Sequence, residues 1–430
     1  MNPMKMKCLL IAALIAGTAL TSAAGDFGEV FADSTLRIDY VLGADHGRVQ
    51  AYEYRQIRLP RWAGRRHHLA ELPLQGNGTL RLRDPQTHAT LYATSFSSLF
   101  QEWLSTPEAS DATRAFEHTV LAPMPRREAD IEFTLFDMRG DTLAHTVTRF
   151  RPDDILVASP SAPRHEVRRL HSGGDPSEAI DVVFLAEGYT PDEAEAFFAK
   201  AREATDEILG YDPYDSRRDR FNFTAIFTPS ADSGVSVPKA GEWRDTPFGS
   251  HFSTFYSDRY LTTPRVWALN DAAAATPYEH IIVLANTDVY GGGGIYNDYM
   301  LTTANNPMFA PVVVHEFGHS FGGLADEYFY EGDVMDDSYP RDVEPWEPNI
   351  TTLTDFDSKW KGLLKPGTPV PTDPKDASRY PVGVYEGGGY SFKGVYRPAD
   401  ECRMRNNTYP TFCGACRAAL ERLIDFYTAK

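Results

Sequence analysis

The chain has 430 residues, of which 42% are hydrophobic and 24% are charged, and its formal net charge is −18. This length favours two domains, and the composition is that of a globular protein with enough apolar side chains for buried cores. The strong negative charge argues against nucleic acid and anionic membrane surfaces as partners, because like charges repel. Composition does not indicate an oligomeric state.

Residues 1–24 have the three parts of a secretory signal peptide. A basic region with Lys5 and Lys7 precedes an apolar run that starts at Cys8, and small residues end at Ala24. The run is too short to span a membrane comfortably, so we expect cleavage after Ala24. We therefore expect an exported protein, whether secreted, periplasmic or at the cell surface, with no integral membrane segment after cleavage.

Residues 25–157 predict an all-β domain. Segments such as STLRIDYVLG and DIEFTLFDMRGDTLAHTVTRF alternate apolar and polar side chains, and turn residues separate them. Several short strands at this spacing are typical of a β-sandwich. The next segment, residues 158–174, is rich in Pro, Ser, Gly and charged residues, and we interpret it as a linker.

From residue 175 to residue 430 the pattern changes to strands that alternate with helices. The apolar runs IDVVFLAEGY, FNFTAIFT and HIIVLAN predict buried strands. Thr190 and Glu193 form a capping-box pattern that predicts the start of a helix. We therefore expect an α/β or α+β domain with a largely parallel, twisted mixed sheet. A strand at the edge of this sheet is expected near residues 295–302.

The segment VVVHEFGHSFGGLADEY contains the spacing His-Glu-x-x-His. On a helix, His315 and His319 are one turn apart on one face, so both imidazoles can reach one metal ion. Glu316 lies beside the first histidine, where it can hold a metal-activated water and accept its proton. The motif predicts a zinc hydrolase with an active-site helix and Glu316 as the catalytic base.

A catalytic zinc needs a third protein ligand, and no histidine follows His319 in the chain. Ala325 occupies the position of the third histidine in the metzincin pattern H-E-x-x-H-x-x-G-x-x-H, and it cannot bind a metal. The next two residues are acids, Asp326 and Glu327. We favour Asp326 as the third ligand, with Glu327 as the alternative. More distant acids are further alternatives: Glu331, Glu344 and Glu347.

The third ligand also requires the helix to end soon after His319. On an unbroken helix Asp326 would lie about 10 Å along the axis from His319, so the two could not share one ion. Gly322 and Gly323 supply the conformational freedom for a turn back. We therefore expect the helix to end at these glycines.

Three cysteines, Cys402, Cys413 and Cys416, cluster near the C-terminus. An odd number in an exported protein favours one disulfide, whose pairing the sequence does not determine, and one free thiol. The alternative is a zinc site, in which the fourth ligand would be a carboxylate because no histidine lies nearby. The acidic segment at residues 331–337 indicates Ca²⁺ only weakly, since it lacks the ligand spacing of an EF-hand.

The chain resembles the bacterial IgA-specific zinc metallopeptidase family, which is regarded as metzincin-like. The resemblance rests on HEFGHSFGGLADEY, on DSGVSVPKAGEWRDTPFGSHFSTFY upstream and on ECRMR…TFCGACR downstream. It covers most of residues 175–430, and the β-domain looks like the accessory domain that precedes the catalytic one. The resemblance implies that His315 and His319 are zinc ligands, that Glu316 is the base and that Met404 belongs to the methionine turn beneath the zinc.

We therefore expect an exported zinc endopeptidase that hydrolyses peptide bonds of protein substrates through a metal-activated water. One alternative is a non-catalytic surface or glycan-binding protein with a structural metal, which would need four protein ligands. Another is a zinc amidase that acts on cell-wall or small amides.

Overall fold

The computed structural model describes residues 26–161, 163–330 and 339–428. The predicted signal peptide, the acidic segment 331–337 and Glu331 lie outside these ranges. Among the described residues, no helix combines the length and the apolar character that crossing a membrane would require.

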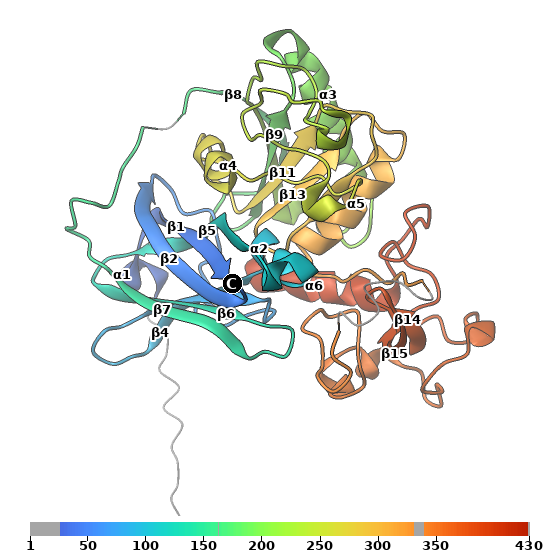
Figure 1. The fold of residues 1–430 in the computed structure, drawn as a ribbon. Coiled ribbons are helices and arrows are strands. Elements are labelled where there is room, and N and C mark those ends of the chain that lie inside the picture. Colours follow the sequence, from blue (N-terminus) through green and yellow to red (C-terminus); the bar gives the residue numbers. More distant parts are fainter. Residues whose placement is uncertain (1–25, 162, 331–338, 429–430) are drawn as a thin grey trace, which may run out of the picture.

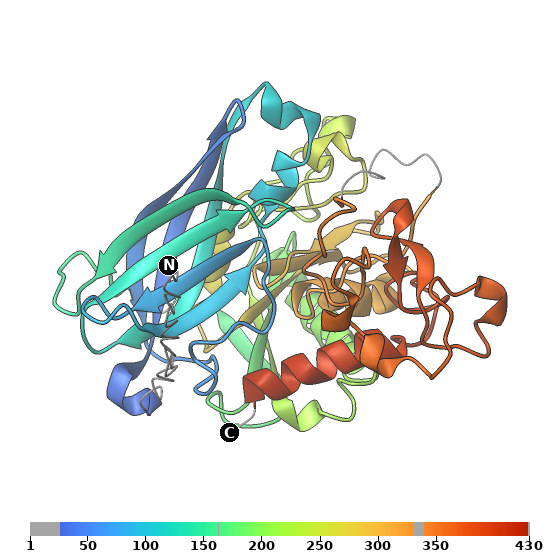
Figure 2. The ribbon, with the colours of Figure 1, turned by 90° about the horizontal axis from the view of Figure 1, so that it is seen from below.

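The N-terminal part consists of two antiparallel sheets that enclose one hydrophobic core (Figures 1 and 2). Its strands are β1 (Phe31–Asp45), β2 (Arg48–Leu59), β3 (Gly78–Arg83), β4 (Thr90–Phe96), β5 (Thr113–Pro125), β6 (Ala129–Phe136) and β7 (Thr142–Phe150). The strand orders are β2-β1-β5 and β4-β3-β6-β7, and short helices α1 (Phe27–Val30) and α2 (Leu99–Leu104) accompany them. Tyr40 of β1 stacks on Phe133 of β6 across this core. The predicted N-terminal β-domain is confirmed.

The C-terminal part is built on a six-stranded mixed sheet with the order β12-β13-β11-β9-β10-β8. The strands are β8 (Glu166–Ser172), β9 (Ile180–Glu187), β10 (Phe221–Phe227), β11 (His280–Ala285), β12 (Gly292–Gly294) and β13 (Tyr299–Thr303). The four inner strands are parallel to one another, while both edge strands are antiparallel to their neighbours. The predicted mixed α/β domain is confirmed.

Helices cover this sheet, and each face has its own hydrophobic cluster. The helices are α3 (Ala194–Ile208), α4 (Val266–Ala273), α5 (Phe309–Ser320) and α6 (Gly414–Thr428). Alternate residues of β9 point to opposite faces: Val182 and Phe184 join the cluster with α3, α5 and α6, and Val183 and Leu185 join the cluster with α4. A small hairpin, β14 (Tyr385–Gly388) and β15 (Ser391–Arg397), lies beyond α5 (Figure 1).

Of three local predictions, the structure confirms the capping box and differs from the linker and the edge strand. Thr190 and Glu193 form the predicted capping box, ahead of α3. The predicted linker is wrong in part, because β8 lies within it and pairs with β10; its alternating charged side chains suit an exposed sheet edge. The expected edge strand near residues 295–302 is also wrong, because β13 is buried and the glycine strand β12 forms the edge.

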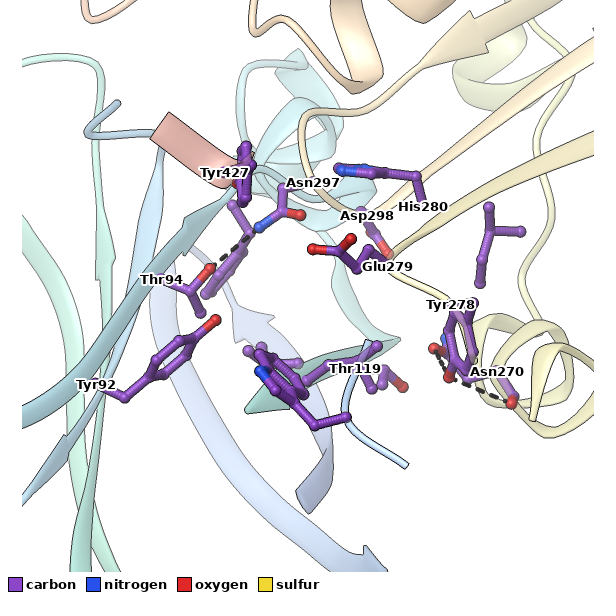
Figure 3. Close-up of a pocket in the computed structure, with 15 residues that line it drawn as sticks. Tyr92, Thr94, Thr119, Asn270, Tyr278, Glu279, His280, Asn297, Asp298 and Tyr427 are labelled. Carbon is purple, nitrogen blue, oxygen red and sulfur yellow. Dashed lines mark hydrogen bonds between the residues drawn. The ribbon is translucent and has the colours of Figure 1, made fainter. Parts of the chain in front are cut away.

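The two parts pack tightly against each other. Leu59 of β2 and Leu99 of α2 belong to the same hydrophobic cluster as α4 and β11, so a shared core joins the two domains. Asn297 donates hydrogen bonds to Thr94 and Ser95 of β4. A small polar cavity remains at this boundary, lined by Tyr92 and residues near the start of β11 (Figure 3). The N-terminal domain is therefore joined to the α/β domain by a shared core and by hydrogen bonds.

Candidate metal centre

Helix α5 places the motif residues against the edge of the sheet. Its apolar side chains, including Val313 and Phe317, pack into the main core, which fixes the opposite face toward β12. His315 and His319 lie on that side, one turn apart, and their ring centroids are 4.7 Å from each other. Packing of the apolar residues thus places both imidazoles on the side of α5 that faces β12, where they lie close to each other.

The structure brings His315, His319 and Asp326 together, and their ligand atoms form a small triangle. The two Nε2 atoms are 3.0 Å apart, and Oδ1 of Asp326 lies 3.1 Å from Nε2 of His315 and 3.3 Å from Nε2 of His319. Three ligands at about 2.0–2.1 Å from a tetrahedral zinc would be about 3.3 Å from one another. The triangle therefore has the dimensions of one face of a zinc coordination tetrahedron, with the fourth position left for water.

The turn after α5 delivers Asp326 to this position. Helix α5 ends at Ser320, and Gly323 has a φ of +58°, with its N–H donating to the carbonyl of His319 at 2.9 Å. This is the left-handed C-terminal motif in which glycine is favoured. Asn349 then pairs with both backbone groups of Ala325. The chain reversal that the sequence required is present, and Gly323 alone of the two glycines adopts the positive φ.

The second nitrogen of each imidazole is engaged by backbone. Nδ1 of His315 donates to the carbonyl of Arg403 at 3.0 Å, and Nδ1 of His319 donates to the carbonyl of Leu324 at 2.5 Å. These bonds select the tautomer whose Nε2 lone pair faces the centre of the triangle. Met404 follows Arg403 and is fully buried, with its Sδ 2.8 Å from where a Cβ on Gly318 would lie. The Met404 side chain thus packs directly against α5 at Gly318.

The charges in the triangle stabilise a carboxylate at residue 326. Burial raises the pKa of Asp326, but the charge of His319 and hydrogen bonds from both imidazoles hold that pKa well below its usual range. Burial also acts to lower the pKa of His319, whereas the neighbouring Asp326 carboxylate raises it to about 9. The Asp326 carboxylate thus favours a protonated His319 ring, which places a positive charge in contact with it.

Glu316 lies beside the triangle and contacts the sheet edge. Burial raises the pKa of its carboxyl above the usual value, while the charges of both histidines lower it and the backbone N–H of Gly294 donates a hydrogen bond to it. The approach of β12 to α5 depends on glycine, since a Cβ on Gly294 would lie 2.3 Å from the carbonyl oxygen of Glu316. A carboxyl group with a raised pKa is thereby placed next to the edge strand β12.

The acids considered as alternative ligands lie elsewhere. The Glu327 carboxylate faces away from the histidines and accepts hydrogen bonds from Asn349 and from the thiol of Cys416. Glu347 accepts from Tyr339, and Glu344 accepts from the backbone of Asp355. Of the acids within the described part of the chain, Asp326 is the one that joins both histidines.

Two further groups near the site escaped the sequence analysis. Tyr390, in the turn of the β14–β15 hairpin, donates its hydroxyl to Oδ2 of Asp326 at 2.5 Å and lies 3.0 Å from the hydroxyl of Tyr328. Glu102 of α2, from the N-terminal domain, has its pKa raised to about 7 by burial, while the charge of His319 lowers it. Neither residue belongs to a local motif, so only the folded chain could identify them.

Comparisons with known protein families agree with this arrangement. Residues 169–380 and 374–424 match the family described as IgA Peptidase M64, and residues 26–146 match the Peptidase M64 N-terminus. The chain belongs to the M64 peptidase family. A search of the curated proteins found no match.

The M64 chain is therefore a metallopeptidase, and its substrates are proteins. Its donor set fits a divalent metal, because two imidazole nitrogens and one carboxylate oxygen converge from three sides within 3.3 Å of one another. The cysteines predicted to form a disulfide are all free thiols and all buried in the structure. The expected disulfide is thus absent within the described residues, where Sγ of Cys402 and Sγ of Cys416 lie 3.8 Å apart, well beyond the about 2.05 Å of an S–S bond.

Proposed function

We propose that this M64 peptidase is an exported, zinc-dependent endopeptidase of the metzincin-like type. The observation that carries the proposal is the triangle of His315, His319 and Asp326, whose spacing suits zinc and whose neighbour is Glu316. Two histidines and one carboxylate are a catalytic zinc set, since they leave one coordination position open.

Each residue has a separate task in this proposal. His315, His319 and Asp326 hold the metal, and Tyr390 keeps the Asp326 carboxylate turned toward it. When bound, zinc polarises the scissile carbonyl and lowers the pKa of the attacking water to about 7. Glu316 accepts the proton of that water and donates it to the leaving amine, a role that its raised pKa favours.

The substrate would bind as an extended strand along β12. This strand pairs with β13 on one side, and its Gly294 packs against α5 beside Glu316 and His319. A glycine edge offers backbone N–H and C=O groups with no side chains in the way, so recognition would depend mainly on the substrate backbone. The scissile bond would then lie next to the base and the metal ligands.

Met404, the N-terminal domain and residues 1–24 also have roles in this proposal. Met404 would serve as the methionine turn, consistent with its contact beneath Gly318. The N-terminal domain would be a β-sandwich accessory domain over residues 25–157, and residues 1–24 would be a cleaved signal peptide. N-terminal sequencing of the exported protein tests the last point, with Gly25 as the expected first residue.

The two alternative functions have less support. A structural zinc would need four protein ligands, but Glu327, the next acid along the chain, faces the cysteines. An amidase for small substrates has no use for a strand edge beside the metal centre, whereas an endopeptidase that binds extended peptides does. Membership of a peptidase family favours protein substrates as well.

Replacement of the base tests the proposal. Glu316→Gln keeps the shape of the side chain but cannot accept a proton, so we expect cleavage of a casein substrate to fall by about 10²–10⁴-fold. Zinc content, measured by mass spectrometry of the metal, should stay at the wild-type value, because Glu316 is not among the ligands.

The matched control is Glu347→Gln. Glu347 is another buried acid of the same domain, but its carboxylate accepts from Tyr339 and is not one of the three groups of the triangle. It should retain both zinc and turnover. Undiminished cleavage by Glu316→Gln, or loss of zinc in Glu347→Gln, would contradict the assignment.

A further inference from the structure

Four buried side chains form a second cluster of metal-binding groups behind the Asp326 turn. They are Glu327, Cys402, Cys413 and Cys416, here called the Cys3Glu cluster, and one ligand atom from each lies within 4.8 Å of all the others. The Cys413 side chain is 7% exposed and the other three are fully buried. The proposed peptidase mechanism uses none of them, and this inference does not depend on that mechanism.

The backbone presents the sulfur atoms as hydrogen-bond acceptors. The N–H of Cys413 donates to Sγ of Cys402 at 3.2 Å, and the N–H of Cys416 donates to Sγ of Cys413 at 3.5 Å. Cys413 directly precedes α6 and Cys416 lies in its first turn, and the N-terminus of a helix favours negative charge. The surroundings thus suit a thiolate at Cys413, the form in which cysteine binds a metal, whereas burial raises the pKa of the Cys402 and Cys416 thiols.

Glu327 brings an unsatisfied carboxylate oxygen into the cluster. Its Oε1 accepts from Asn349 at 3.0 Å and from the thiol of Cys416 at 2.9 Å. Its Oε2, among the described residues, is fully buried without a hydrogen-bond partner. A buried carboxylate oxygen without a partner is costly unless a cation satisfies it.

The spacing and the charge agree with a tetrahedral ion. Sγ of Cys402 and Sγ of Cys416 are 3.8 Å apart. Two thiolates bound to a tetrahedral zinc at about 2.3 Å each would be separated by about 3.8 Å. Two buried guanidinium groups act on the cluster electrostatically, Arg397 on Glu327 and Arg403 on Cys402, and would offset the surplus negative charge.

We propose that the Cys3Glu cluster holds a second, structural zinc ion. Four protein ligands close the coordination sphere, so no position remains for water or substrate. Binding releases the thiol protons to solvent. It also moves the Glu327 carboxylate slightly away from Cys416, because the sulfur and the oxygen, now hydrogen-bonded at 2.9 Å, would be about 3.6 Å apart as two ligands of one tetrahedral zinc.

The position of this ion gives it a task in the fold. Glu327 directly follows Asp326, and the N–H of Glu327 donates to the carbonyl of Met404 at 2.8 Å. The ion would therefore join three segments: the turn that carries the third catalytic ligand, the Met404 loop and the start of α6. It acts on the catalytic site by positioning, without touching the substrate.

Metal counting on the full chain is the first test. We expect two zinc ions per chain in the wild type, and one in the His315→Ala/His319→Ala variant, which lacks the catalytic ligands. X-ray absorption at the zinc edge of that variant should show a sulfur shell at about 2.3 Å. Exchange of cobalt into the wild-type chain should produce an intense thiolate-to-cobalt charge-transfer band, which a site without sulfur does not give.

Single substitutions assign the ligands. Cys416→Ser should lose one zinc per chain and lower the melting temperature, while catalytic zinc remains measurable when free zinc is supplied. Asp181→Asn is the matched control, because Asp181 is also buried and, within the described residues, also has a carboxylate oxygen without a partner. This control should keep both ions.

Other results would overturn the proposal. A His315→Ala/His319→Ala variant that holds no zinc, or a zinc spectrum without sulfur, would show that the cluster does not bind the metal. A non-reduced digest with two of the cysteine peptides joined by a disulfide would do the same. The cobalt and X-ray measurements need no cysteine variant, so a Cys416→Ser protein that fails to fold leaves both tests intact.

Discussion

At the scale of single residues, the metal site depends on hydrogen bonds that fix the orientation of each ligand. Both imidazoles donate from Nδ1 to backbone carbonyls, and Tyr390 donates to Asp326. Such partners hold a ligand in the conformation that the metal needs, so their loss weakens metal binding although they never touch the metal.

Tyr390→Phe tests this support. The substitution removes only the hydroxyl that bonds to Oδ2 of Asp326, so we expect zinc affinity to fall by about 10–100-fold. Competition with a chelator at buffered free zinc measures the change. Tyr396→Phe, in the same hairpin, should leave the affinity as it is, and equal affinities in all three proteins would refute the role of Tyr390.

At the scale of secondary structure, the close approach of β12 to α5 depends on glycine. Gly294 lies so close to the helix that a Cβ would meet the carbonyl of Glu316 at 2.3 Å and the Cβ of His319 at 3.0 Å. Backbone atoms cannot yield as a flexible side chain does. The strand and the helix must therefore shift apart when any larger residue is introduced.

Gly294→Ala should destabilise the protein by about 1–3 kcal/mol, the usual cost of overpacking. We also expect a lower kcat, because the strand edge and the base move relative to each other. Urea unfolding and steady-state kinetics measure the two effects. Gly362→Ala, at a position with open space around the added Cβ, should change neither, and an unaltered Gly294→Ala protein would contradict the close approach.

At the scale of the whole molecule, the two domains meet at a boundary that buries ionisable groups (Figure 3). His280 lies there between the rings of Phe321 and Tyr427. Burial lowers the pKa of His280 to about 4, whereas burial raises the pKa of Asp181 to about 7. The two groups thus change the stability of the fold in opposite directions as the pH changes.

The contribution of His280 can be isolated with His280→Phe. Between the folded pKa near 4 and the unfolded value of 6.5, the unfolded chain binds the proton and the folded chain does not, so acid favours unfolding. From pH 7 to pH 5 the wild type should lose about 2 kcal/mol more than the variant. Urea unfolding of both proteins at each pH measures this difference, which should vanish if His280 is charged in the folded state.

The sequence by itself determined the local features of this protein. Period-two alternation predicted the β-domain, continuous apolar runs predicted the inner strands, and the His-Glu-x-x-His spacing predicted one helical face with two metal-binding imidazoles. These features can be predicted from the sequence because each depends only on residues that are close together in the chain, within one strand or one or two helical turns. The missing later histidine also limited the third ligand to other residue types, with a carboxylate favoured.

The tertiary structure alone decided the features that join distant segments. Asp326 and Glu327 are adjacent, yet Asp326 faces the histidines and Glu327 faces cysteines some 75 to 90 residues later in the chain. Hydrogen bonds of this segment to Asn349 and to the backbone of Met404 fix the two directions. Tyr390 and Glu102 reach the site from a hairpin and from another domain. No local pattern encodes such contacts, since they exist only after long loops have closed.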